Sequence, residues 1–140
     1  MVNRIAVIFS MAFLLMLFAG CTSSDNETES PSVETKASYT HISQEKAQEM
    51  MTYDDGHYVV DVRTREEFAQ GHIPNAFCIP NEEIGTERPE ELPDLDQVIL
   101  VYCRTGRRSA EASQKLADMG YTHIYEFGGI VDWTGEVVTG

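Results

Sequence analysis

From residue 39 onward, the chain alternates short apolar runs with segments whose apolar positions follow a helical period. Short apolar runs, with a dense β-branched run at 57–62, predict strands at residues 39–42, 57–62, 76–79, 97–102 and 123–125. The segments between them predict helices at residues 44–51, 65–70 and 109–119, with a short final helix after Gly128. Two prolines interrupt the acidic segment 81–96, where we expect a broken helix and a loop.

This alternation predicts an α/β fold in which parallel strands are covered by helices on both faces. Ser43 can cap the first helix, and Thr64 with Glu67 three residues later forms a capping box for the second. In open parallel sheets, ligands bind at the carboxyl ends of the strands. The segment that follows the strand at 97–102, the strongest of the five, is therefore the first candidate for chemistry.

The N-terminal segment has the pattern of an export signal. Residues 5–20 form an uncharged apolar run behind Arg4, shorter than the roughly 20 residues that a spanning helix needs. The junction with Cys21 is similar to a bacterial lipobox, in which the cysteine is lipidated, although Phe18 stands where leucine is preferred. We therefore expect residues 1–20 to be a lipoprotein signal peptide. The alternatives are an uncleaved anchor helix and signal cleavage elsewhere.

Residues 21–38 are rich in Ser, Thr, Glu and Asp and poor in apolar groups, so we expect a flexible tether that begins at the lipidated Cys21. The folded domain is then residues 39–140. Every interpretation of the first segment implies export. We expect a protein of the bacterial cell envelope, lipid-anchored to a membrane outside the cytoplasm, with inner and outer membrane both open.

Charge and cysteine content exclude several function classes. The 140 residues include 10 Lys and Arg against 23 Asp and Glu, a formal net charge of −13. A polyanion repels phosphate backbones, which excludes general nucleic-acid binding. Three cysteines without a C-x-x-C pair exclude a disulfide-built scaffold, a zinc ribbon and a thioredoxin-type site. A monomer is the default expectation.

The candidate chemistry lies in residues 103–109, with the sequence CRTGRRS. Gly106 allows a tight turn, and a loop that runs into a helix start directs backbone N–H groups inward as an anion nest. These groups, the helix dipole and nearby arginines all favour the thiolate form of Cys103. The predicted site is the nucleophile Cys103 with an anion cradle of Arg104, Thr105, Gly106, Arg107, Arg108 and Ser109. The alternative is a small core cysteine flanked by exposed arginines.

Residues 39–140 resemble a single-domain rhodanese, a sulfurtransferase. The resemblance rests on Asp61-Val62-Arg63, Glu67-Phe68, Gly71 to Ala76, the 103–109 loop, and Gly128-Gly129-Ile130 with Trp133. Asn75 replaces a glycine that is common in the family, and asparagine tolerates turn geometry. The resemblance implies a five-stranded parallel sheet flanked by helices. It also implies a persulfide on Cys103, with Asp61 and Arg63 as supporting residues that orient loops.

The reaction implied is transfer of a sulfane sulfur from thiosulfate or a persulfide donor to cyanide or a thiol. It needs small-molecule donors and acceptors and no metal or organic cofactor. Cysteine phosphatases and arsenate reductases on this architecture are the nearest rival enzymes. Phosphatases hold phosphate in a C-x5-R loop, and here Arg108 comes one residue too early. A non-catalytic rhodanese-like binding module is the third reading, against which Cys103 argues.

Two further residues have ordinary structural interpretations. Cys78 falls in a predicted buried strand, where an inert core thiol is expected. Its alternative role is a regulatory disulfide with Cys103 in an oxidising envelope. His72 lies in a Gly-His-Ile-Pro turn, where we expect it to pack against the turn and not to act as a base.

Overall fold

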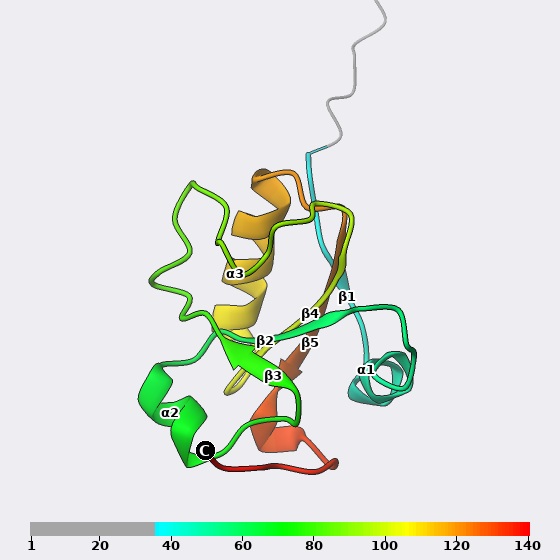
Figure 1. Cartoon of the computed structure of the whole chain (residues 1–140), viewed down its shortest axis with the longest axis vertical. Coiled ribbons are helices and arrows are strands. Elements are labelled where there is room, and N and C mark those ends of the chain that lie inside the picture. The colour runs from blue at the N-terminus through cyan, green and yellow to red at the C-terminus, as the bar shows by residue number, and fades with distance from the viewer. Residues whose placement is uncertain (1–35) are drawn as a thin grey trace, which may run out of the picture. The chain divides into compact units, whose positions relative to one another are not determined.

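The computed structural model describes residues 36–140, which form one parallel five-stranded sheet with helices against it (Figure 1). Its elements are β1 (Thr40–His41), α1 (Gln44–Met50), β2 (Tyr58–Asp61), α2 (Arg65–Gln70), β3 (Ala76–Cys78), β4 (Val98–Cys103), α3 (Arg107–Asp118), β5 (His123–Gly129) and the 3-10 helix η1 (Ile130–Asp132). The expected signal peptide, Cys21 and most of the expected tether lie outside the described residues. None of the helices within residues 36–140 is long and apolar enough to cross a membrane.

The strands lie in the order β1-β5-β4-β2-β3, and every neighbouring pair is parallel, which confirms the predicted α/β class. Strand β4 pairs with β2 on one side and β5 on the other, and five of its six residues are buried. A parallel strand covered on both faces must be apolar throughout, which explains the run VILVYC. The chain therefore leaves the middle of the sheet at Cys103.

Two hydrophobic cores cover the two faces of the sheet. On one face, Ile99 and Val101 of β4 pack with Ala112 and Leu116 of α3. On the other face, Leu100 and Tyr102 pack with Ala47 of α1 and with Phe127. Because side chains alternate along a strand, β4 contributes residues to the hydrophobic core on each face of the sheet. Figure 1 shows α3 and α1 on opposite sides of the strands.

The predicted helix caps are present. The Ser43 hydroxyl accepts the Lys46 N–H at the start of α1. Thr64 and Glu67 form both hydrogen bonds of the capping box at α2. Asn75 has a φ of 64°, the left-handed turn conformation that asparagine tolerates.

Two predictions about regular structure were wrong in extent. Strand β5 runs from His123 to Gly129 and not only to Tyr125, because the buried Glu126 finds hydrogen-bond partners and need not end the strand. Helix α3 begins at Arg107 and not at Ser109. Its N-cap is Gly106, whose φ of 108° supplies the turn without any side-chain cap.

Two further expectations need correction. Residues 81–96 contain turns and no helix, consistent with the two prolines in the segment. The short final helix is a 3-10 turn, Ile130–Asp132. It leads to Trp133, whose ring lies 5.7 Å from that of Phe127 and packs against the same hydrophobic core of the sheet.

Candidate active site

Cys103 is the last residue of β4 and is 1% exposed. Its sulfur nevertheless faces the loop, because the Gly106 N–H donates to Sγ at 3.1 Å. The left-handed turn at Gly106 brings this amide over the sulfur. The nucleophile predicted from the sequence therefore lies on the floor of a small backbone cradle.

The cradle favours the thiolate. Burial raises the pKa of the Cys103 thiol, since a charge is poorly solvated there. Donors around the sulfur lower that pKa: the Ser109 hydroxyl, when its proton points at the sulfur, and the amides of Ser109, Gly106 and Thr105. Together they outweigh burial, so the pKa of Cys103 falls below its ordinary value and the sulfur is activated.

Ser109 belongs to the first turn of α3 and is fully buried. Its hydroxyl lies 2.9 Å from the Gly106 carbonyl oxygen. The same hydroxyl lies 2.5 Å from the carboxylate of Glu126. Sequence reasoning missed Glu126, for which the one available signal was a charged residue within an apolar strand.

The three loop arginines have different environments. Arg108 makes a two-pronged ion pair with Glu67 of α2, at 2.8 and 2.9 Å. This pair lowers the pKa of the Glu67 carboxyl to about 2. Arg107 is 81% exposed and lies 3.8 Å from Glu111. The exposed Arg104 is left as the arginine best placed to meet an incoming anion.

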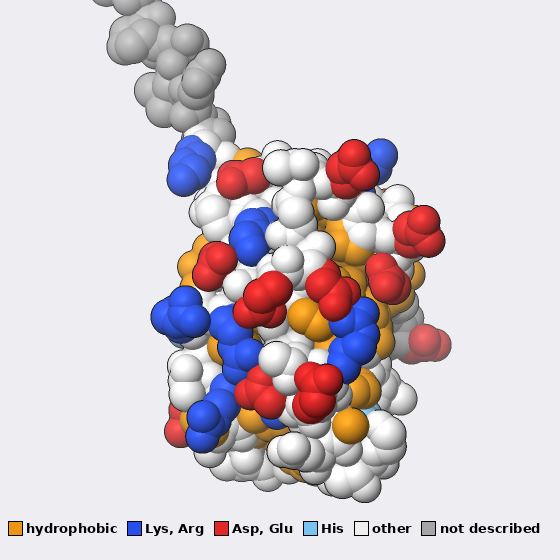
Figure 2. Space-filling view, turned by 90° about the vertical axis from the view of Figure 1, so that its left-hand side faces the viewer, with side chains coloured by type: hydrophobic (Ala, Val, Ile, Leu, Met, Phe, Trp, Pro, Cys, Tyr) orange, Lys and Arg blue, Asp and Glu red, His pale blue; other side chains and the backbone are white. Residues whose placement is uncertain are grey.

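Arg104 lies between two hollows at the mouth of the loop. One, of about 370 Å³, is lined by Glu82, Arg104, Thr105, Arg107 and Arg108. The other, of about 390 Å³, is lined by Arg63, Glu67, Gln70, Gly71, Arg104, Ile130 and Val131. Either can hold a small anion beside Arg104. Figure 2 shows Lys and Arg side chains among Asp and Glu on one face, so the acidic chain does not present a uniformly negative surface there.

Asp61 and Arg63 form the buried ion pair expected of supporting residues. The Arg63 guanidinium donates to both Asp61 oxygens, with the shortest contact at 2.6 Å. The same group donates to the Gly71 carbonyl at 2.6 Å. It thereby ties the end of β2 to the end of α2. His72 stacks on Phe68 at 3.7 Å between ring centres, which matches the turn-packing prediction.

Cys78 does not join the site. Both Cys78 and Cys103 are free thiols. They lie on strands separated by β2, which puts their backbones about 9.5 Å apart, beyond the roughly 7 Å that a disulfide spans. Burial raises the pKa of Cys78 to about 11, as does the nearby Asp61. The regulatory disulfide is therefore contradicted. The predicted burial was wrong, because Cys78 is half-buried on the edge strand β3, but its raised pKa supports an inert thiol.

The two thiols should react at very different rates. At about pH 8, iodoacetamide should modify Cys103 at least about tenfold faster than Cys78, because the lowered pKa leaves more thiolate at Cys103. The Cys78 rate should rise only as the pH approaches 11. Peptide mass mapping over time measures both rates. Equal rates at pH 8 would contradict the cradle's effect on the sulfur.

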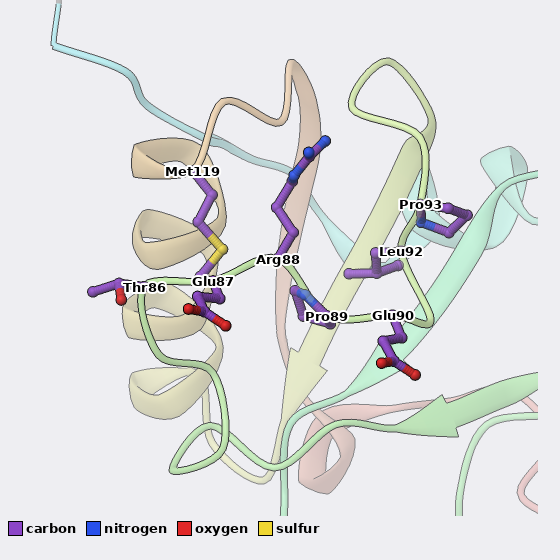
Figure 3. A pocket seen from close by; sticks show the side chains of 8 residues that line it. All are labelled: Thr86, Glu87, Arg88, Pro89, Glu90, Leu92, Pro93 and Met119. Atoms are coloured by element: carbon purple, nitrogen blue, oxygen red, sulfur yellow. The ribbon is translucent and has the colours of Figure 1, made fainter.

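A further hollow lies away from the cradle. It measures about 670 Å³ and lies between the segment 86–93 and the end of α3 (Figure 3). Its lining is Thr86, Glu87, Arg88, Pro89, Glu90, Leu92, Pro93 and Met119, and it includes no residue of the cradle. Within residues 36–140, no group of three His, Cys, Asp or Glu side chains is arranged to hold a metal ion.

Comparison with known proteins decides the family. The model of the rhodanese-like domain matches residues 43–136, which include the whole cradle. The chain belongs to the rhodanese-like family. Thiosulfate sulfurtransferase PspE of Escherichia coli is 38% identical over 73 residues, covering 52% of this chain and 70% of that protein. A sulfurtransferase of Allochromatium vinosum is 41% identical over 76 residues, covering 54% and 69%.

A solved structure confirms the rhodanese fold. A rhodanese with anions from E. coli superposes with a TM-score of 0.56 at 37% identity, covering 61% of this chain and all of that one. A rhodanese-like domain protein from Staphylococcus aureus superposes with a TM-score of 0.61 at 29% identity, covering 72% and 98%. By fold and by homology, the chain is thus a rhodanese-type sulfurtransferase.

Proposed function

We propose that this rhodanese transfers the outer sulfur of thiosulfate through a persulfide on Cys103. The thiolate attacks the outer sulfur, the S–S bond of thiosulfate breaks, and sulfite leaves with the bonding electron pair. The products are a Cys103–S–S⁻ persulfide and sulfite, so charge is conserved. Cyanide or a thiolate then attacks the outer sulfur and releases the Cys103 thiolate.

The observation that carries this proposal is the Gly106 N–H at 3.1 Å from the Cys103 sulfur. The amides of Thr105 and Ser109 also act on the sulfur. Backbone donors arranged in this way stabilise negative charge before it forms, at no cost in reorganisation. The same donors can hold the outer sulfur of the persulfide.

The environment of Arg108 weighs against phosphate chemistry. In a C-x5-R loop the arginine binds the phosphoryl oxygens, whereas here Arg108 is held by Glu67 through two hydrogen bonds. Such bidentate pairs are among the strongest polar contacts in proteins. Arg108 therefore joins α3 to α2 through Glu67, which engages its guanidinium.

Arg104 should steer the anionic donor. Replacing Arg104 with glutamine is expected to raise the KM for thiosulfate about five- to tenfold, because one charge-assisted contact at an exposed site is lost. The Arg107→Gln variant is the matched control and should change KM less than twofold, since that side chain is 81% exposed and faces Glu111. Steady-state kinetics at low and high salt measure both. Equal effects of the two substitutions would contradict a special role for Arg104.

A parallel assay tests the reaction class. The purified protein is offered thiosulfate with cyanide, and separately a generic phosphate ester. Formation of thiocyanate without phosphate release supports the proposal. Phosphate release without thiocyanate would assign the loop to thiol-phosphatase chemistry. Activity on neither substrate would favour the non-catalytic binding module.

We further propose that the protein is exported and lipid-anchored in the bacterial cell envelope through Cys21. The support is the apolar run at residues 5–20 and the position of Cys21 directly after it. The wild-type chain should enter the membrane fraction and carry a diacylglycerol on Cys21. The Cys21→Ala variant should lose that mass. An unmodified N-terminus on the wild-type protein would contradict the anchor.

A further inference from the structure

A buried carboxylate lies beneath the sulfur cradle and is not used in the mechanism above. Glu126 of β5 is 3% exposed. Its Oε1 accepts from the Ser109 hydroxyl at 2.5 Å and from the Gly128 N–H at 2.8 Å. Its Oε2 lies 2.6 Å from Nδ1 of His41, whose side chain is 71% exposed. Burying a carboxylate is costly, so this position calls for an explanation.

The fold places Glu126 directly against the first turn of α3. Side chains alternate along a strand, and Glu126 shares a face with Ile124, which packs in the core under α3. Ser109, three residues after Gly106, points from α3 toward the same face. The carboxylate therefore reaches the site through Ser109.

The Ser109 hydroxyl has one proton and several acceptors within reach. These are Glu126 Oε1 at 2.5 Å, the Gly106 carbonyl at 2.9 Å and the Gly128 carbonyl at 3.4 Å. The Cys103 thiolate is a further acceptor for the same proton. A charge-assisted bond to a carboxylate is about twice as strong as one to a neutral carbonyl. The proton therefore goes to Glu126, which also makes the shortest of these contacts.

We propose that Glu126 is a positioning residue for sulfur transfer, which holds the Ser109 hydroxyl proton away from the Cys103 sulfur and so keeps the thiolate strongly nucleophilic. This inference rests on the proposed function. Glu126 acts in two ways. Its carboxylate withholds a hydrogen bond from the sulfur, and its negative charge opposes ionisation of the thiol.

The other charges around the loop leave this role to Glu126. Arg108 is paired with Glu67, and Arg63 is paired with Asp61. His41, which contacts Glu126, has a side chain that is 71% exposed and lies largely in solvent. Arg104 and Arg107 of the same loop are exposed to solvent, and Arg107 lies 3.8 Å from Glu111.

Such tuning has opposite effects on the two half-reactions. A thiolate of higher pKa attacks thiosulfate faster, but it is a poorer leaving group when an acceptor removes the outer sulfur. Rates change with about the 0.4–0.5 power of basicity, so one pKa unit corresponds to about threefold in rate. Glu126 is thus expected to favour loading of the enzyme over its discharge.

Glu126→Leu tests the proposal, because leucine fills the buried site without charge or acceptor. The pH dependence of Cys103 alkylation, followed by peptide mass mapping on the full chain, should show a pKa lower by about one unit. At about pH 9, where the thiol is ionised in both proteins, sulfite release in a single turnover should slow about threefold. Discharge of the persulfide to a thiol should quicken about threefold. An unchanged or higher pKa, or a slowing of both half-reactions, would overturn the proposal.

Two companion variants separate the hydrogen bond from the charge. Glu126→Gln keeps an acceptor for Ser109 and should lower the Cys103 pKa by less than Glu126→Leu does. When Ser109 is also replaced by alanine, Glu126→Leu should lower the Cys103 pKa only as much as Glu126→Gln does. Ser113→Ala is the matched control, since Ser113 is also buried on α3 one turn later and should leave the full shift intact. If Glu126→Gln and Glu126→Leu lower the Cys103 pKa equally, the Ser109 hydroxyl has no part in the effect, which would refute that half of the proposal.

The role of Glu126 can be tested separately from misfolding of the variant and from failure of the proposed function. If circular dichroism shows Glu126→Leu unfolded, the Glu126→Gln variant carries the test alone, and its pKa must fall and its two half-reactions must change in opposite directions. Alkylation reports the thiol without any sulfur donor. If the wild-type protein does not release sulfite from thiosulfate, the proposed function is refuted. If the wild-type protein is active but the Glu126 variant has an unchanged Cys103 pKa, only the role of Glu126 is refuted.

Discussion

Replacing Cys103 with serine is expected to abolish thiosulfate:cyanide sulfur transfer, with a loss of at least about a thousandfold in kcat/KM. A serine hydroxyl is not ionised near neutral pH and forms no persulfide, so no intermediate remains to carry the sulfur. Thiocyanate formation measures the loss. Thermal unfolding should change little, because the oxygen occupies the place of the sulfur under the Gly106 amide.

The matched control is Cys78→Ser. Cys78 is separated from the cradle by strand β2, and its pKa is raised to about 11. This variant should keep at least about half of the wild-type rate. Activity retained in Cys103→Ser, or lost in Cys78→Ser with the fold intact, would contradict the assignment of the nucleophile.

Adding one methyl group at Gly129 is the second change with a large expected effect. A Cβ there would lie 2.1 Å from the Arg104 carbonyl oxygen and 2.6 Å from Thr105 Cα. Both are backbone atoms, so the loop itself must move. Gly129 also pairs with Cys103 across β4 and β5, which brings the disturbance to the nucleophile. We expect Gly129→Ala to lower kcat/KM at least about a hundredfold and to destabilise the fold by about 3 kcal/mol.

Thiocyanate kinetics and thermal melting measure the two effects of Gly129→Ala. Gly85→Ala is the control, because no heavy atom lies within 4 Å of the added methyl and the backbone there needs no positive φ. That variant should match the wild type in both measurements. Wild-type activity in Gly129→Ala would show that the loop does not need its close approach to β5.

The sheet and the tight loop after Cys103 could be predicted from the sequence because their signals are local. The run VILVYC has the continuous apolar pattern of a strand buried on both faces, and Gly106 after Cys103 marks a tight turn. The capping box at Thr64 and Glu67 is equally local. These elements placed the cradle at the carboxyl end of β4 without knowledge of the strand order.

What could not be predicted depends on partners distant in sequence. The role of Arg108 is decided by Glu67, 41 residues away, so the sequence could not rank the three arginines. In the sequence, the charge of Glu126 predicts the end of a strand. The structure shows that Ser109 and His41 supply hydrogen-bond partners for its carboxylate. The Cys78–Cys103 disulfide could be excluded only once the strand order was known, because β2 lies between the two strands that carry these cysteines. Polar contacts between elements are set by tertiary packing, which periodicity does not describe.

The central claim is that Cys103 carries the transferred sulfur, and intact-mass analysis after thiosulfate treatment tests it most directly. The wild-type protein should gain the mass of one sulfur atom and lose it again when cyanide is added. Peptide mapping should place the added atom on Cys103, and the Cys103→Ser variant should show no gain. A wild-type protein that turns over thiosulfate with no added mass, or with the sulfur on Cys78, would contradict the account.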